Sequence, residues 1–184
     1  MRVYKGKHIN FLPDDYTVVD IETNGMDVNC CEIIETSAVR FRANERTAAF
    51  SCLIKPKSKI SPFVTRLTGI TDAMAQGGRE LLPALTDFTD FLGDDIIMGY
   101  NVNFDINFLY DNILSELGFP LKNDYFDVLR MARRTMPALV NHKQTTVAEF
   151  FGIDTDGAHR AEKDCLICAD VYIKLRKYLS GIRP

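Results

Sequence analysis

Three segments in the first third of the chain have the pattern of β-strands. Residues 16–22, 33–41 and 47–54 are rich in β-branched and aromatic side chains, and turn-forming residues bound the first of them. The polar link 42–46 between the second and third segments is short enough for a hairpin. The pattern therefore predicts three consecutive antiparallel strands.

The rest of the chain is predicted to be mostly helical, with one short strand. Ser61 and Pro62 are typical of a helix start, and Gly69 of its end. Apolar positions also recur at helical spacing between residues 82 and 92, and 96–100 is a short apolar strand. Further helices are predicted over 103–117, 127–135, 145–151 and 161–179. Strands first, followed by strand–helix alternation, predict an α/β fold with a mixed sheet flanked by helices.

Length and composition are those of one ordinary globular domain, covering residues 1–184. Of the 184 residues, 46% are hydrophobic and 26% are charged, which excludes disordered, collagenous and coiled-coil classes. No apolar run approaches the roughly 18 residues that a membrane span needs. The basic N-terminus lacks the apolar core of a secretory signal. We therefore expect no membrane association.

The five cysteines indicate a reducing compartment. Their number is odd and Cys30 is adjacent to Cys31, so no complete set of disulfides is expected. Cys165 and Cys168 have the spacing of a metal-binding pair, but no second pair accompanies them, and they are predicted to be small core residues. The expected location is the cytoplasm.

The charge of the chain is unevenly distributed. The net charge is −3, which argues against a protein that coats nucleic acid nonspecifically. Basic residues nevertheless gather in two stretches, 40–66 and 128–143. They are either solvated faces or surfaces that hold a nucleic-acid strand.

Acidic residues stand at the ends of the predicted elements. Asp20 and Glu22 are two positions apart in the first strand. Because side chains of a strand point alternately to its two faces, these two share one face. Asp105 and Asp164 fall in first helical turns, and His159 precedes Asp164 in a glycine-flanked loop. Taken singly, each has an ordinary explanation as a surface acid, a favourable helix-dipole charge or a polar loop residue.

Together these residues form three ordered motifs: D-x-E-T-x-G at 20–25, G-x-N-x-x-F-D at 99–105 and H-x-x-x-x-D at 159–164. The set resembles the DEDDh (DnaQ-like) family of 3′–5′ exonucleases, and the resemblance covers roughly residues 16–179. Within that family it looks most like the exonuclease domain of the proofreading epsilon subunit of bacterial DNA polymerase III. Tyr100 stands where many members have histidine, and Arg160 stands where the tyrosine branch of the superfamily has its tyrosine.

The resemblance implies an RNase H-like fold and a two-metal site. Asp20, Glu22, Asp105 and Asp164 would hold two Mg²⁺ ions, which Mn²⁺ can replace, and His159 would be the general base on the attacking water. Carboxylate oxygens suit these cations, and an imidazole titrates in the range that this role needs. The residues expected to contact the terminal nucleotide are Thr23, Asn24, Gly25, Met26, Leu67, Ile70, Asn101 and Phe104. For the apolar members of this set, core packing is the alternative.

The function implied is removal of nucleoside 5′-monophosphates from the 3′ end of single-stranded nucleic acid. DNA is expected in preference to RNA, in a proofreading role, with DNA polymerase III as a candidate partner. Two alternatives stay open. One is an exoribonuclease that trims RNA or short oligonucleotides, and the other is a non-catalytic subunit that binds nucleic acid or a polymerase.

Overall fold

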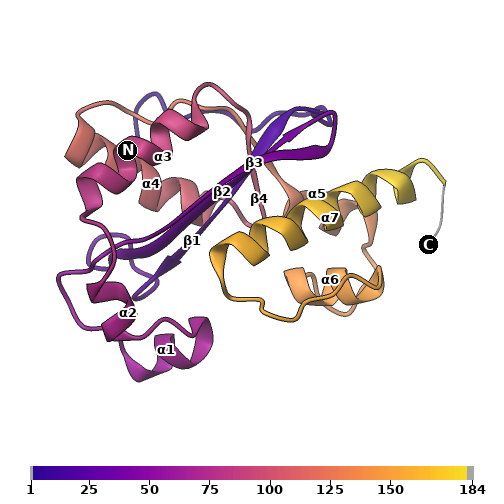
Figure 1. Ribbon diagram of the computed structural model, residues 1–184. Coiled ribbons are helices and arrows are strands. Elements are labelled where there is room, and N and C mark those ends of the chain that lie inside the picture. Colours follow the sequence, from indigo (N-terminus) through magenta and orange to yellow (C-terminus); the bar gives the residue numbers. More distant parts are fainter. Residues whose placement is uncertain (1, 182–184) are drawn as a thin grey trace.

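A mixed sheet of five strands, with helices on both faces, organises residues 2–181, the part of the chain that the computed structural model describes (Figure 1). The strand order is β3-β2-β1-β4-β5. The first three strands pair antiparallel, whereas β4 joins β1, and β5 joins β4, in parallel. This confirms the predicted fold class. The strands are β1 (Tyr16–Thr23), β2 (Ile33–Arg42), β3 (Glu45–Leu53), β4 (Ile97–Gly99) and β5 (Tyr125–Asp127).

The helices follow the predicted order, with one addition. They are α1 (Pro62–Thr68), α2 (Asp72–Gln76), α3 (Leu81–Leu92), α4 (Asn103–Leu117), α5 (Val128–Thr135), α6 (Gln144–Phe150) and α7 (Ala161–Leu179). The pattern did not predict α2, which has only five residues, or strand β5, which has three residues and leads directly into α5. Among residues 2–181, none of the helices combines the length and the hydropathy needed to cross a bilayer.

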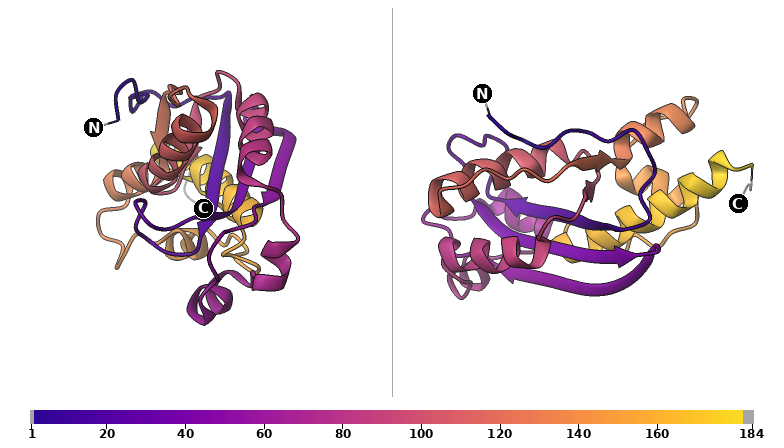
Figure 2. Two further views of the ribbon diagram at one scale, coloured as in Figure 1. Left: turned by 90° about the vertical axis from the view of Figure 1, so that its left-hand side faces the viewer. Right: turned by 90° about the horizontal axis from the view of Figure 1, so that it is seen from above.

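Alternation along β1 divides the core into two layers. Tyr16 and Val18 pack with α5, α6 and α7, whereas Val19 and Ile21 pack with α3 and α4 on the opposite face. The ribbon shows α3 and α4 on one side of the sheet and α7 on the other (Figure 1; Figure 2). Asp20 has the same parity as Tyr16 and Val18, so it lies on the α7 face.

The link from β4 to α4 brings a third segment close to β1. Gly99 ends β4, and a Cβ there would lie 2.7 Å from Val102 Cγ2 and 3.0 Å from the carbonyl oxygen of Val19. Only glycine allows this approach without a shift of the neighbours. Asn101 then turns the chain with a φ of 62°. As a result, the N-terminus of α4 lies beside the C-terminal half of β1.

Cys165 and Cys168 lie inside the core on α7, with 0% and 2% exposure. Their predicted role as core residues is therefore confirmed. All five thiols of the chain are free.

Candidate active site

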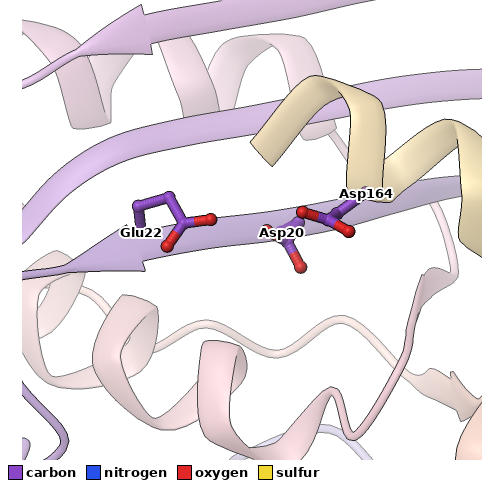
Figure 3. A group of neighbouring side chains, drawn as sticks. All are labelled: Asp20, Glu22 and Asp164. Atoms are coloured by element: carbon purple, nitrogen blue, oxygen red, sulfur yellow. The ribbon is translucent and has the colours of Figure 1, made fainter. Parts of the chain in front are cut away.

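Three carboxylates from distant parts of the sequence meet on the α7 face of the sheet (Figure 3). Asp20 and Glu22 project from β1, and Asp164 approaches them from the first turn of α7. One oxygen of each lies within 4.8 Å of those of the other two. The fold thus brings together three of the four acids that the motifs single out.

The position of Asp20 and Glu22 follows from the alternation of β1. Ile21 between them is 5% exposed and packs into the opposite layer of the core. Antiparallel pairing with β2 includes both Asp20 and Glu22 on one side of the strand. On the other side, β4 pairs with Thr17 and Val18, and Asp105 accepts the N–H of Ile21. Because the strand is anchored on both sides, the two carboxylates have a fixed direction.

Asp164 is oriented by hydrogen bonds from two segments. The backbone N–H of His159 donates to its Oδ2 at 2.7 Å. The side-chain amide of Gln144, at the start of α6, donates to its carbonyl oxygen at 2.9 Å and to Oδ1 at 3.3 Å. These bonds hold the Asp164 carboxylate toward β1.

Asp105 occupies the first turn of α4 and is 5% exposed. Its Oδ1 accepts a hydrogen bond from the backbone N–H of Ile21 at 3.1 Å. Asp105 is outside the group of three oxygens within 4.8 Å, yet it lines the same cavity as Asp20, Glu22 and Asp164. The fourth acid therefore faces the site while it ties α4 to β1.

Burial and mutual repulsion raise the pKa of every carboxyl in this group. Burial, and then the charges of Asp164 and other acids, raise the pKa of Glu22 to about 8. Burial also raises the pKa of Asp105 to about 7, against the opposing effect of its backbone hydrogen bonds. The pKa values of Asp20 and Asp164 are raised as well, and burial is the main cause in both.

This donor set fits a hard divalent cation. Mg²⁺ and Mn²⁺ prefer carboxylate oxygens as ligands. Closely spaced carboxyl groups resist ionisation because their negative charges repel each other, and a bound cation stabilises their ionised form. The carboxylates of Asp20, Glu22 and Asp164 provide such oxygens, and Asp105 is beside them in the same cavity.

His159 lies at the same cavity, in the loop before α7. Its side chain is exposed and its backbone has a φ of 68°. The positive φ turns the chain just before the helix, so that the N–H of His159 reaches Asp164. The cavity has a volume of about 260 Å³ and is lined by Asp20, Ile21, Glu22, Tyr100, Asn101, Phe104, Asp105, Gln144, His159 and Asp164.

Two of the residues expected to contact a nucleotide line this cavity. The Asn101 side chain is exposed, while its backbone N–H donates to Asp127 Oδ1 at 3.1 Å. Phe104 is half-buried and packs on Phe108 with ring centroids 5.0 Å apart. An amide and an aromatic ring are therefore available beside the carboxylates.

The loop after β1 has an internal bonding network. Thr23 Oγ1 donates to the Gly25 carbonyl at 2.6 Å, and the side-chain amide of Asn24 bonds to Glu32. A Cβ on Gly25 would lie 2.5 Å from Cys31 Sγ, so a larger residue here would have to displace the Cys31 side chain. Met26 is 82% exposed, which leaves its side chain free for contact with a ligand.

Leu67 and Ile70 have different environments. Leu67 on α1 is 44% exposed, but Ile70 is fully buried and packs with Ile34, Ile60 and Val64. Ile70 therefore belongs to the core, and the structure does not bring it to the cavity. The sequence alone does not distinguish these two environments, because both residues are isolated apolar positions among polar neighbours.

Sequence reasoning did not select three residues of the cavity, Ile21, Tyr100 and Gln144. Gln144 orients Asp164, and only the tertiary contact reveals that role. Tyr100 stands where many family members have histidine. Its hydroxyl donates to the His142 carbonyl at 2.7 Å, which connects the turn after β4 with the segment before α6.

The first basic stretch is partly used inside the molecule. Arg40 and Arg42 both pair with Asp95, at 2.9 and 2.6 Å. Arg46 pairs with Glu162 at 2.9 Å. Several positive charges of the first stretch are therefore neutralised by ion pairs within the protein.

In the second stretch, Arg130 and Arg134 line another cavity, of about 300 Å³, which shares no lining residue with the carboxylate cavity.

The family assignment agrees with this geometry. A family model described as exonuclease (RNase_T) matches residues 17–172. The chain belongs to this exonuclease family. The matched region includes Asp20, Glu22, Asp105, His159 and Asp164.

Curated relatives include both a separate subunit and a domain of a larger polymerase. The chain is 35% identical over 170 residues to the DNA polymerase III subunit epsilon of Aquifex aeolicus, covering 92% of this chain and 84% of that protein. It is 32% identical over 171 residues to a PolC-type DNA polymerase III of Caldanaerobacter subterraneus, but spans only 12% of that protein. These similarities make the chain an enzyme of the 3′–5′ exonuclease type.

Solved structures agree on the fold. Zinc-bound E. coli exonuclease I in complex with single-stranded DNA superposes with a TM-score of 0.77 at 19% identity. The match covers 91% of this chain and 41% of that one. The architecture is therefore RNase H-like, as the sequence motifs implied.

Proposed function

We propose that this exonuclease removes nucleotides one at a time from the 3′ end of single-stranded DNA and releases nucleoside 5′-monophosphates. The observation that supports this most is the meeting of Asp20, Glu22 and Asp164 within 4.8 Å, in a cavity that His159 and Asp105 also line. A proofreading role beside a DNA polymerase is part of the proposal. It is supported by the similarity to an epsilon subunit over 84% of that protein.

The four acids would hold two divalent cations, Mg²⁺ or Mn²⁺, because their four negative charges match two such ions. When bound, the cations would neutralise charge on the phosphate and lower the pKa of water. His159 is exposed at the cavity, in a loop whose backbone N–H is bonded to Asp164. We assign it the role of general base, which takes a proton from the water as that water attacks phosphorus and the 3′ oxygen of the preceding nucleotide leaves.

The side chains around the carboxylates would orient the terminal nucleotide. Phe104 can pack against the base whatever its identity, and Asn101 can hydrogen-bond to base or phosphate. Met26 and Leu67 are the other exposed apolar candidates. Thr23, Asn24 and Gly25 would contribute mainly backbone groups, since their side chains are engaged within the loop or absent.

The choice of DNA rests on the relatives. The similar epsilon subunit is named for a DNA polymerase, and the similar exonuclease I structure holds single-stranded DNA. We also place the enzyme in the cytoplasm, an assignment that its five free thiols support.

Product analysis and competition test this proposal. Digestion of single-stranded DNA should yield nucleoside 5′-monophosphates, and an equal amount of RNA of the same sequence should compete poorly. Preferential degradation of the RNA would favour the exoribonuclease alternative. Binding of DNA without any release of nucleotides would favour the non-catalytic alternative.

A further inference from the structure

A buried carboxylate outside the four acids holds the segment that carries His159 and Asp164. Glu35 of β2 is 2% exposed. Its Oε1 accepts a hydrogen bond from Arg160 Nη2 at 2.7 Å, and its Oε2 accepts one from Arg160 Nε at 3.2 Å. Oε2 also accepts the backbone N–H of Ala161 at 3.1 Å. Such a bidentate carboxylate–guanidinium pair is both strong and directional.

Glu35 lies directly opposite Glu22 in the antiparallel register. Opposed residues of two paired strands project from the same face, so Glu35 is on the active-site face of the sheet. Two like charges in this arrangement repel each other, and Arg160 lies where it compensates both. The hydrogen bonds to Glu35 are the main cause that raises the pKa of Arg160, and the charge of Glu22 adds to the effect.

The same contact organises the start of α7. Arg160 is the N-cap residue of this helix, and its side chain makes no capping hydrogen bond. The first helical N–H, that of Ala161, is satisfied instead by Glu35 from the sheet. A carboxylate at this end of a helix is also favoured by the helix dipole. Glu35 thus acts as a cap supplied by a neighbouring strand.

His159 and Asp164 lie at the two ends of the segment that Glu35 holds. Arg160 follows His159 directly, and the N–H of Asp164 bonds to the carbonyl of Arg160 at 3.0 Å. The Asp164 carboxylate itself accepts hydrogen bonds from His159 and Gln144, and both of these residues lie outside the sheet. Two ion pairs therefore connect this segment to the sheet: the exposed pair Arg46–Glu162, and the pair of Arg160 with Glu35, whose carboxylate is buried on the face that carries Asp20 and Glu22.

We propose that Glu35 is a positioning residue of the exonuclease reaction. By holding Arg160 and the first N–H of α7, it sets Asp164 against Asp20 and Glu22 and keeps His159 at the cavity. This inference rests on the proposed function in assigning roles to His159 and to the carboxylates. It adds a role for Glu35 and Arg160, neither of which lines the carboxylate cavity.

The substitutions Glu35→Gln and Arg160→Gln test this role, alone and together. Each should lower kcat by about tenfold or more with little change in KM for DNA, as expected when a residue that orients metal ligands is altered. Each should also raise, by about tenfold, the Mn²⁺ concentration that gives half of the maximal thermal stabilisation. Because both residues act through one contact, the double variant should be no worse than the more damaging single one.

Glu162→Gln is the matched control. It removes an ion pair with Arg46 in the same helical turn, but on the exposed side. Its kcat and Mn²⁺ dependence should match those of the unmodified enzyme. If buried Glu35→Gln does not fold, the half-exposed Arg160→Gln carries the test alone.

The readouts separate failure of this inference from failure of the proposed function. Variants that melt at lower temperature, yet keep kcat and Mn²⁺ half-saturation within about twofold of the unmodified enzyme, would show a purely structural link and overturn the inference. An unmodified enzyme without nuclease activity would refute the proposed function. In that case the Mn²⁺ titration would still decide whether Glu35 positions Asp164.

Discussion

At the scale of single residues, Asp20 is an acid surrounded by four other carboxyl groups, those of Glu22, Glu35, Asp105 and Asp164. Burial and the charges of Asp105, Asp164 and Glu22 together raise its pKa well above the usual range. This unfavourable burial of like charges is what a bound cation would relieve. It follows that replacing Asp20 with a neutral residue of the same shape removes both the repulsion and a ligand.

We therefore expect opposite effects of Asp20→Asn with and without metal. At a pH near 8.5, the metal-free variant should melt about 2–4 °C higher than the unmodified protein, which corresponds to about 1 kcal/mol. Its stabilisation by saturating Mn²⁺ should be largely lost. The measurement is thermal unfolding, with Asp90→Asn, an exposed acid on α3, as the control that changes neither value. An unchanged Mn²⁺ shift in Asp20→Asn would contradict the ligand assignment.

His159 allows a separate test of proton transfer. Substitution of His159 by alanine should lower kcat by about 10²–10⁴-fold, the usual contribution of a general base. Stabilisation by Mn²⁺ should persist, because the hydrogen bond to Asp164 comes from the backbone of His159. Nuclease assays and melting curves of the same preparation would show both effects. A rate within about twofold of the unmodified enzyme would remove His159 from this role.

At the scale of elements, the β2–β3 hairpin has a turn that the sequence does not favour. Ala43 and Asn44 both have positive φ, 51° and 62°. Asparagine accepts this conformation, whereas alanine is strained by it. The turn therefore contains one residue whose replacement should improve the fold.

Ala43→Gly should stabilise the protein by about 1 kcal/mol, because glycine adopts positive φ without the clash of a Cβ. Equilibrium unfolding in urea would measure the change. Ala49→Gly, at an exposed position within β3, is the matched control and should instead destabilise by about 0.5–1 kcal/mol. Destabilisation by both changes to a similar extent would contradict the strain argument.

Sequence patterns predicted every helix and strand of residues 2–181 except α2 and β5. The alternation of β1 and the apolar spacing of α4 depend on neighbours along the chain, so both could be recognised. Strand β5 has three residues and leads directly into α5, so its pairing with β4 could not be recognised along the chain. Glu35 could not be selected either, since its importance depends on a register with Glu22 and a contact with Arg160 that only the folded chain creates. Likewise, the burial of Ile70 depends on packing against Ile34 of β2.

At the scale of the whole molecule, the topology is what assembles the site. Placing β4 next to β1 brings the start of α4, and with it Asp105, to the strand that carries Asp20 and Glu22. The return of α7 across the opposite face brings Asp164. The stability of the whole chain is therefore coupled to the charge of this cluster.

That coupling gives a pH dependence. The pKa values of Glu22 and Asp105 are raised to about 8 and about 7, above their ordinary values of 4.5 and 3.8. Groups whose pKa is raised by folding contribute stability below their unfolded pKa and lose that contribution as the pH rises through the folded value. The metal-free protein should thus become less stable between about pH 6 and about pH 9.

Saturating Mg²⁺ should reduce this loss, because the cation binds the ionised carboxylates of the folded protein. Unfolding curves at the two pH values, with Mg²⁺ and with EDTA, would measure the effect. A fall in stability that is equally large with Mg²⁺ would mean that other groups cause it.

The most direct test of the account is digestion of single-stranded DNA labelled at its 5′ end. With Mg²⁺, the enzyme should produce a ladder that shortens from the 3′ end, and both EDTA and Asp20→Asn should abolish it, while Asp90→Asn should not. Labelled DNA that stays intact with Mg²⁺ and with Mn²⁺, or a ladder that persists unchanged in Asp20→Asn, would contradict the claim that these carboxylates form the active site of a 3′–5′ exonuclease.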